Sequence, residues 1–216
     1  TMSVNDEIDQ WLHRAYDASG NREKLDDLYD DWAKDYDQHI WASGNPYIAV
    51  ATGMAGRHVP DFDASILDAG CGTGNMAQLL HQMGYNNLEG LDPSGGMLDE
   101  ARRKNIYKKM HQLVLAAKVD LPDASFDAVV AAGVLTHGHA PAESLDGIVR
   151  LVKPGGIIIF SLSEIAYNEH GFGDKMTELE DKGVWTSVER TRPFRTYPFS
   201  EAQAHLKHWV CVYKSC

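Results

Sequence analysis

Three glycines, Gly70, Gly72 and Gly74, lie within five residues of the stretch ILDAGCGTGN, directly after an apolar run. A glycine in a regular element costs roughly 0.5–1 kcal/mol relative to alanine, so this density indicates that the backbone lies against a ligand. No Gly-Lys-Ser/Thr follows, which excludes the phosphate-binding P-loop. The dinucleotide fingerprint needs a glycine where Asn75 stands, so an NAD site fits poorly.

Two aspartates flank the glycines. Asp92 ends the next apolar segment along the chain, where a carboxylate can accept hydrogen bonds from ribose hydroxyls. Asp68 directly precedes the glycines, where it would repel a pyrophosphate but could orient the loop or reach an ammonium group through water. These residues favour a ligand with a ribose, a positive amino group and no phosphate. S-adenosylmethionine is such a ligand.

The elements that position these residues alternate between strands and helices from residue 66 onward. Short apolar runs predict strands at 65–70, 88–92, 111–117, 126–134 and 156–162, and apolar residues at helical spacing predict helices at 75–84, 95–105 and 141–152. A turn is predicted at the KPGG stretch. Strands separated by helices form a parallel sheet with right-handed crossovers and helices on both faces. The predicted fold class is therefore α/β.

The two ends of the chain differ from this alternation. Before residue 60 the pattern predicts three helices, the second over 22–38 and the third over 45–59. Near the other end, two strand-like segments at 184–191 and 207–215 have no helix between them, which predicts an antiparallel pair. In the 75–84 helix, Met83 is expected to point inward together with Met76, Leu79 and Leu80.

The composition limits which partners the protein is expected to bind and the cellular compartment in which it is expected. The chain has 20 Lys and Arg against 31 Asp and Glu, a net charge of −11, which disfavours nucleic acid. No apolar stretch approaches the ~20 residues that span a bilayer, so we expect no membrane partner. The three scattered cysteines argue against a disulfide framework, so we expect a cytoplasmic protein, with the nucleus as a second location. The histidines and cysteines show no metal-ligand spacing, so no metal is expected.

An aromatic stripe lies in the 22–38 segment. Tyr29, Trp32 and Tyr36 fall at i, i+3 and i+7, so they share one face of the predicted helix. Two interpretations stay open: the stripe packs on the core, or it forms a lid over the cofactor. A sulfonium cation is attracted to aromatic faces by roughly 0.5–2 kcal/mol.

The motifs resemble those of the class I S-adenosylmethionine-dependent methyltransferases. The resemblance rests on ILDAGCGTG, LEGLDPSGGMLDEAR, LPDASFDAVVAAGVLTH and LVKPGGIIIF, which together span about 100 residues in the family's order and spacing. The segments LYDDWAKDYDQ, FDAVVAAGVL and KPGG are most similar to the methyltransferase-like proteins of the Williams–Beuren syndrome region. The resemblance implies a Rossmann-like, seven-stranded, mostly parallel sheet with an antiparallel last strand. It also implies one domain over 1–216, with a helical lid at 1–60, a cofactor-binding core at 61–165 and an acceptor side at 166–216.

The resemblance further implies where S-adenosylmethionine binds. The three glycines would let the backbone approach its methionine part, Asp92 would hold the ribose, and Ala132 and Gly133 would contact the methionine through backbone groups. Family members often have an aspartate where Ala117 stands, so the adenine amino group would be recognised elsewhere, for example by backbone near Lys118. The complete set of implied cofactor-binding residues is Tyr29, Tyr36, Asp68, Gly70, Cys71, Gly72, Gly74, Asp92, Pro93, Met97, Ala117, Lys118, Ala132 and Gly133.

The acceptor side offers fewer signals. Methyl transfer from sulfonium needs a general base only if the acceptor is protonated. His137 follows the 126–134 strand and is the candidate catalytic base, with His139 second, although a loop histidine can simply be solvated. Tyr167, Asn168 and His170 follow the 156–162 strand and are candidates for lining the acceptor pocket.

We therefore expect an enzyme, a monomer or weak dimer, that methylates a small molecule and releases S-adenosylhomocysteine. Two alternatives stay open. One is a non-catalytic S-adenosylmethionine-binding module. The other is a protein or peptide methyltransferase, in which Arg190, Arg192 and Arg195 could meet an acidic acceptor. An NAD dehydrogenase is disfavoured by Asn75.

Overall fold

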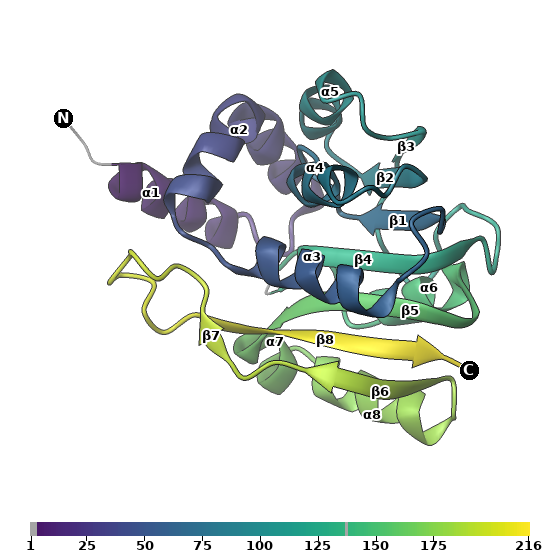
Figure 1. Cartoon of the computed structure of the whole chain (residues 1–216). Helices are drawn as coiled ribbons and strands as arrows, with labels where there is room; N and C mark the ends of the chain where they lie inside the picture. Colours follow the sequence, from purple (N-terminus) through teal and green to yellow (C-terminus); the bar gives the residue numbers. More distant parts are fainter. Residues whose placement is uncertain (1–3, 137) are drawn as a thin grey trace.

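A twisted sheet forms the centre of the computed structural model, which describes residues 4–136 and 138–216 (Figure 1). Its strands run in the order β3-β2-β1-β4-β5-β8-β6, and the short β7 pairs with β8 as an eighth strand within the described residues. The strands are β1 (Ile66–Ala69), β2 (Leu88–Asp92), β3 (Lys109–Gln112), β4 (Phe126–Leu135), β5 (Val152–Ser163), β6 (Trp185–Arg190), β7 (Phe194–Arg195) and β8 (Lys207–Ser215).

The directions of the strands confirm the predicted sheet. β1 to β5 pair in parallel, and β8 lies antiparallel between β5 and β6. After β5, the chain first forms β6 at the edge of the sheet. It then returns as β8, which lies between β5 and β6. Both the predicted antiparallel last strand and the pairing of the last two long strands are confirmed.

Helices cover both faces of the sheet. They are α1 (Val4–Asp17), α2 (Arg22–Ala42), α3 (Tyr47–His58), α4 (Asn75–Gln82), α5 (Gly95–Arg103), α6 (Ser144–Leu151), α7 (Glu164–Glu169) and α8 (Phe172–Asp181). Residues of α3 and α4 share one buried cluster with the sheet, whereas residues of α6, α7 and α8 share another. Along β4, Ala128 and Val130 belong to the first cluster, and Val129 and Ala131 to the second. This burial on both faces explains why β4 is apolar at successive positions.

α1 and α2 lie at one end of the sheet rather than on a face. Figure 1 shows them at the end opposite the C-terminus, where β8 begins. Because β8 runs antiparallel to β1, β2, β4 and β5, this is the end at which those parallel strands finish. Ligands of α/β sheets bind at the carboxyl ends of the strands, so α1 and α2 cover the place where a ligand is expected.

Three predictions are wrong: the bounds of the third strand, the turn at KPGG and the inward position of Met83. β3 covers Lys109–Gln112 instead of 111–117, because this edge strand is largely exposed and the following apolar run leaves the sheet to bury Leu115 in the core. The KPGG stretch lies inside β5 as an irregularity: Phe126 pairs with Val152, but Ala128 pairs with Ile157. Met83 is 42% exposed because α4 ends at Gln82, one residue before it.

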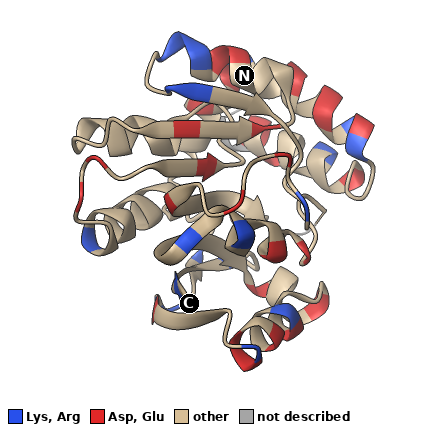
Figure 2. Cartoon of the chain, turned by 90° about the vertical axis from the view of Figure 1, so that its right-hand side faces the viewer, with Lys and Arg blue, Asp and Glu red and all other residues tan. Residues whose placement is uncertain are grey.

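Charge is mixed over the surface. Figure 2 shows Lys and Arg interspersed with Asp and Glu on the helices of the face in view, rather than gathered into one basic area. Within the described residues, we find no helix that combines the length and the apolar character needed to cross a membrane. The three cysteines form no disulfide; Cys71 and Cys211 are buried and Cys216 is exposed.

Candidate active site

The glycine-rich loop turns sharply from β1 toward α4. Gly70 has a φ of +74°, and a Cβ there would lie 2.2 Å from Cγ2 of Val134. Both conditions require glycine at this position. The backbone amides of Gly70 and Cys71 donate to the carbonyl of Leu91, at 2.7 and 2.9 Å. The loop is therefore fixed against the end of β2.

Asp92, at the end of β2, connects this loop to the next one. Its carboxylate accepts hydrogen bonds from the amides of Gly72 (2.9 Å) and Ser94 (3.0 Å). Burial raises the pKa of Asp92 to about 6, although these two hydrogen bonds oppose the rise. A carboxylate has about four acceptor sites, so Asp92 can accept further bonds from a pair of hydroxyls.

A narrow cavity of about 90 Å³ lies where β1, β2 and β4 end. We call it the cofactor cavity. Nine of the residues expected to bind the cofactor line it or bound it, and the structure brings them together there: Tyr29, Tyr36, Gly70, Gly72, Asp92, Pro93, Met97, Ala132 and Gly133. Arg22, Ser94 and Leu115 also line it, without having been expected from the sequence.

Five expected residues lie outside this lining. Asp68 is buried beneath the loop, where it accepts a hydrogen bond from the hydroxyl of Tyr107 (2.7 Å), and burial raises its pKa to about 7. Cys71 is also buried, and burial raises its pKa well above the usual value. The remaining residues are Gly74, which forms the N-cap of α4, and the exposed Ala117 and Lys118.

Two aspartates of α2 hold both loops of the cofactor cavity. Asp30 accepts hydrogen bonds from Ser94 Oγ (2.5 Å) and the Gly96 amide (2.8 Å) at the start of α5. One carboxylate oxygen of Asp37 accepts hydrogen bonds from side chains on the glycine-rich loop and at the start of α4. The other oxygen forms an ion pair with the lysine that directly follows α5. These partners are Thr73 Oγ1 (2.5 Å), Asn75 Nδ2 (2.9 Å) and Lys104 Nζ (2.7 Å). We call these contacts of Asp30 and Asp37 the clamp. The sequence did not predict it, because acidic residues on an acidic helix are typical of a solvent-exposed face.

The aromatic stripe of α2 divides between the core and the cofactor cavity. Trp32 is 1% exposed and stacks on Trp11 of α1 with ring centroids 5.3 Å apart, so it packs in the core. Tyr29 and Tyr36 instead line the cofactor cavity. The Tyr29 hydroxyl lies 2.6 Å from Nε2 of His139, which follows β4. These two tyrosines lie where a lid over the cofactor would be.

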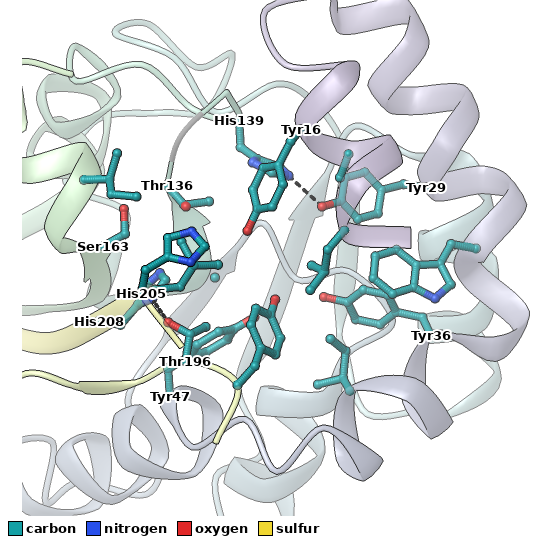
Figure 3. A pocket seen from close by; sticks show the side chains of 18 residues that line it. Tyr16, Tyr29, Tyr36, Tyr47, Thr136, His139, Ser163, Thr196, His205 and His208 are labelled. Atoms are coloured by element: carbon teal, nitrogen blue, oxygen red, sulfur yellow. Dashed lines mark hydrogen bonds between the residues drawn. The ribbon is translucent and has the colours of Figure 1, made fainter. Parts of the chain in front are cut away.

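A second cavity of about 230 Å³ lies on the other side of Tyr29 and Tyr36, and we call it the acceptor cavity. Figure 3 shows its labelled side chains arranged around a common space. It shares Tyr29, Tyr36, Gly133 and His139 with the cofactor cavity. Its other lining residues are Leu12, Ala15, Tyr16, Trp32, Ile40, Tyr47, Thr136, Ser163, Ile165, Thr196, Tyr197, His205, Leu206 and His208. The two cavities therefore meet at the end of β4.

Gly133 at this junction has no room for a side chain. Its φ is +78°, and a Cβ would lie 2.6 Å from the hydroxyl oxygen of Tyr47. Its amide donates to Ser161 Oγ at 2.7 Å. The backbone thus bends inward between the two cavities, where β4 also shifts its register with β5.

The residues expected on the acceptor side lie in different places. The candidate base His137 lies outside the described residues. Tyr167 and Asn168 belong to α7 rather than to a loop, and Tyr167 packs edge-on against Trp209. His170 lines a separate outer cleft instead of the acceptor cavity.

The arginines near the C-terminus also lie away from the acceptor cavity. Arg190 lies over the ring of Trp209, and Arg195 pairs with Glu201; neither is among the lining residues, and Arg192 is exposed. Among the residues described, no cluster of three or more His, Cys, Asp or Glu is arranged to hold a metal ion.

Comparison with known proteins identifies the family. A family model described as a methyltransferase domain matches residues 67–160. The chain is 32% identical to methyltransferase-like protein 27 from Homo sapiens over 168 residues, 74% of this chain and 68% of that protein. It is 35% identical to a ubiquinone biosynthesis O-methyltransferase from Alkalilimnicola ehrlichii over 100 residues, 44% of this chain but only 40% of that enzyme.

The fold is shared with solved structures. A putative S-adenosylmethionine-dependent methyltransferase from Listeria monocytogenes superposes with a TM-score of 0.60 at 16% identity, over 78% of this chain and 99% of that one. Sequence, fold and the loops around the cofactor cavity agree. The chain belongs to the class I S-adenosylmethionine-dependent methyltransferase family.

Proposed function

We propose that this methyltransferase transfers the methyl group of S-adenosylmethionine to a small molecule held in the acceptor cavity. The observation that carries the proposal is the junction of the two cavities at Tyr29, Tyr36, Gly133 and His139. Methyl transfer from sulfonium is an in-line displacement, so the acceptor must approach the methyl group from the side opposite the sulfur. A cavity that begins where the cofactor cavity ends supports this arrangement.

The cofactor binds along the carboxyl ends of the strands in this proposal. Asp92 accepts hydrogen bonds from the ribose hydroxyls, and Pro93 and Met97 lie beside the adenine. The backbone of the glycine-rich loop and of Gly133 lies against the methionine part. The methyl group then faces Tyr29 and Tyr36. In support, these residues line one narrow cavity, and Asp92 keeps acceptor sites free beside the two amides that it binds.

The position of the acceptor cavity supports a small molecule rather than a protein or nucleic acid. Side chains of α1 and α2 close it on one side, and the segment around Tyr197 and Leu206 closes it on another. A volume of about 230 Å³ is somewhat below the roughly 300–1,000 Å³ of drug-sized ligand sites. The net charge of −11 further disfavours RNA or DNA as the acceptor.

The same geometry supports different roles for three successive parts of the chain. Of the described residues, those before 61 provide the lid, those from 61 to 165 line most of the cofactor cavity, and those from 166 onward form one wall of the acceptor cavity. In our proposal the protein acts as a monomer or weak dimer in the cytoplasm. Sedimentation of the purified chain and localisation of the tagged protein test these two points.

The function is tested by coupling binding to turnover. Calorimetry with S-adenosylmethionine, S-adenosylhomocysteine and NAD should show micromolar binding of the two sulfur compounds and none of NAD. Release of S-adenosylhomocysteine is then measured with a panel of small metabolites, with an Asp92→Ala variant as the control. Acceptor-dependent release supports the proposal. Donor binding without turnover on any small molecule would favour the non-catalytic module, and methyl incorporation only into protein would favour a protein methyltransferase.

A further inference from the structure

The chemistry of the acceptor cavity narrows the class of molecule that it can hold. We infer that the acceptor is an uncharged, ring-sized molecule whose reacting group is a hydroxyl, and that His208 binds this hydroxyl and takes its proton. This inference rests on the proposed function, because it assumes that the acceptor cavity holds the methyl acceptor. It adds the charge of the substrate and a catalytic residue that binds the reacting hydroxyl.

The first observation is the charge of the wall. Among the described residues that line the acceptor cavity there is no Asp, Glu, Lys or Arg. Its polar groups are hydroxyls and imidazoles, contributed by Tyr16, Tyr29, Tyr36, Tyr47, Tyr197, Thr136, Ser163, Thr196, His139, His205 and His208. Burying an ion without an opposite charge costs far more than burying a hydrogen-bonded hydroxyl. A carboxylate, phosphate or ammonium group would find no counter-ion in this wall.

The donor adds to the selection against positively charged acceptors. The sulfonium of S-adenosylmethionine is positive and lies at the junction of the two cavities in the proposed function. A protonated amine in the acceptor cavity would be repelled by it at short range, in surroundings that screen charge poorly. The aromatic side chains also favour a planar ring, since ring faces and edges pack at 4.5–7 Å. An uncharged ring with a polar substituent fits both the wall and the donor.

The second observation is the placement of His208. Its side chain comes from β8 and is 5% exposed in the wall of the acceptor cavity (Figure 3). Its Nδ1 lies 2.6 Å from the hydroxyl of Thr196, and its ring lies against Tyr47 with centroids 5.5 Å apart. Burial lowers its pKa to about 4, so the imidazole is neutral near pH 7. When Nδ1–H donates to Thr196, Nε2 holds the lone pair that a hydroxyl requires.

The other histidines of the cavity are less suited to this task. Nε2 of His139 lies 2.6 Å from the Tyr29 hydroxyl, which occupies that nitrogen. His205 is exposed, so water competes for its ring nitrogens. His208 is thus the buried imidazole whose orientation is fixed by a neighbouring side chain.

Bonds, proton and charge are all accounted for when His208 takes the proton of the acceptor. An oxygen lone pair of the acceptor forms the new O–CH₃ bond while the S–CH₃ bond breaks, and its electron pair stays on sulfur as the neutral thioether of S-adenosylhomocysteine. The acceptor proton moves to Nε2 of His208 and later to water. The site carries one positive charge before and after the step, because the charge lost at sulfur appears on the imidazole. As the O–CH₃ bond forms, the acceptor proton becomes far more acidic than in the free hydroxyl, so a weak base is adequate to remove it.

Ring probes of similar shape test the charge selection. p-Cresol, toluene, benzylamine and benzoate are compared by ligand-observed NMR on protein saturated with S-adenosylhomocysteine. We expect p-cresol to bind at least tenfold more tightly than benzylamine or benzoate, and severalfold more tightly than toluene. Equal or tighter binding of either charged probe, or no binding of p-cresol, would overturn the inference. A protein that does not bind S-adenosylhomocysteine would instead refute the proposed function.

Two substitutions test the role of His208. His208→Leu removes both ring nitrogens, and we expect it to abolish the preference for p-cresol over toluene while S-adenosylhomocysteine affinity stays within twofold. His208→Gln keeps an acceptor oxygen and should retain part of the preference. The control His58→Gln changes a partly buried histidine that pairs with Glu189 outside both cavities, and it should behave like the unmodified protein. A preference that survives in His208→Leu would exclude this residue as the acceptor's partner.

Discussion

The hydroxyl of Tyr29 lies 2.6 Å from Nε2 of His139, although the two residues are 110 positions apart in the chain. The contact joins α2 to the segment after β4, and both residues line the cofactor cavity and the acceptor cavity. The wall between the cavities is therefore built partly from α2, which forms the proposed lid. A change in the lid should affect donor binding and acceptor binding together.

Substitution of Tyr29 tests the lid. Tyr29→Ala removes the ring that we propose lies beside the sulfonium, and an aromatic–cation contact contributes roughly 0.5–2 kcal/mol. We expect the affinity for S-adenosylmethionine to fall about 2- to 30-fold in calorimetry. Tyr29→Phe is the matched control, because it keeps the ring and removes only the hydrogen bond to His139. Unchanged affinity in Tyr29→Ala would mean that this tyrosine only packs against the protein.

The pKa of Asp92 makes donor binding depend on pH. Burial raises the pKa of this carboxyl to about 6 in the free protein, and the ionised form is the better acceptor for ribose hydroxyls. Binding should therefore favour loss of the proton, so the affinity should rise as the pH increases from 5 to 7 and level off above. Calorimetry across this range measures the rise. In Asp92→Ala we expect affinity to be about 10- to 100-fold weaker, as for the loss of hydrogen bonds to a charged group, and the Asp92 contribution to the pH dependence to vanish.

Asp68 makes folding stability depend on pH in the opposite direction to an ordinary carboxylate. Burial raises its pKa in the folded protein to about 7, against 3.8 without the protein environment, so the folded state binds a proton more tightly than the unfolded state. The Asp68 contribution to the free energy of unfolding therefore falls as pH rises from about 4 to 7. Asp68→Asn removes the charge and keeps an acceptor for Tyr107. At pH 8 we expect it to be more stable than the parent protein, by at most roughly 4 kcal/mol.

Chemical denaturation at pH 5 and pH 8 measures this effect. The difference between Asp68→Asn and the parent protein should be larger at pH 8 than at pH 5, by roughly 2–3 kcal/mol. Asp63→Asn, at an exposed position before β1, is the control and should show no such difference between the two pH values. A constant difference at both pH values would show that Asp68 is ionised throughout.

The clamp formed by Asp37 should control the mobility of the lid. Asp37→Ala removes hydrogen bonds from Thr73 and Asn75 and the ion pair with Lys104. We expect faster amide hydrogen exchange in α2 and in residues 70–75, together with weaker binding of S-adenosylmethionine. Asp35→Ala changes an exposed aspartate on the same helix and serves as the control. Equal exchange in the two variants would show that other contacts hold the lid.

The cofactor half of the site could be predicted from local patterns. The spacing of the glycines and the position of Asp92 after an apolar strand predict both loops, because a backbone that turns sharply beside a ligand leaves few choices of residue. The helical spacing of Tyr29 and Tyr36 likewise predicts a common face. The contacts of Asp30 and Asp37 could not be predicted, because their partners are distant in sequence and the neighbouring residues on α2 are acidic and polar.

The acceptor half could not be predicted in the same way. Tyr47, Thr196 and His208 come from α3, from the segment after β7 and from β8, and no local spacing relates them. They meet only because β8 inserts between β5 and β6. The boundary of β3 was wrong for a related reason, since an exposed edge strand lacks the apolar pattern that marks buried ones.

A crystal structure of the protein with S-adenosylhomocysteine tests the central claim most directly, namely that the two cavities hold donor and acceptor on either side of one junction. We predict that the ribose lies at Asp92 and that the sulfur faces the acceptor cavity between Tyr36 and Gly133. A bound S-adenosylhomocysteine whose sulfur points away from that cavity, or one that occupies the acceptor cavity itself, would contradict the account.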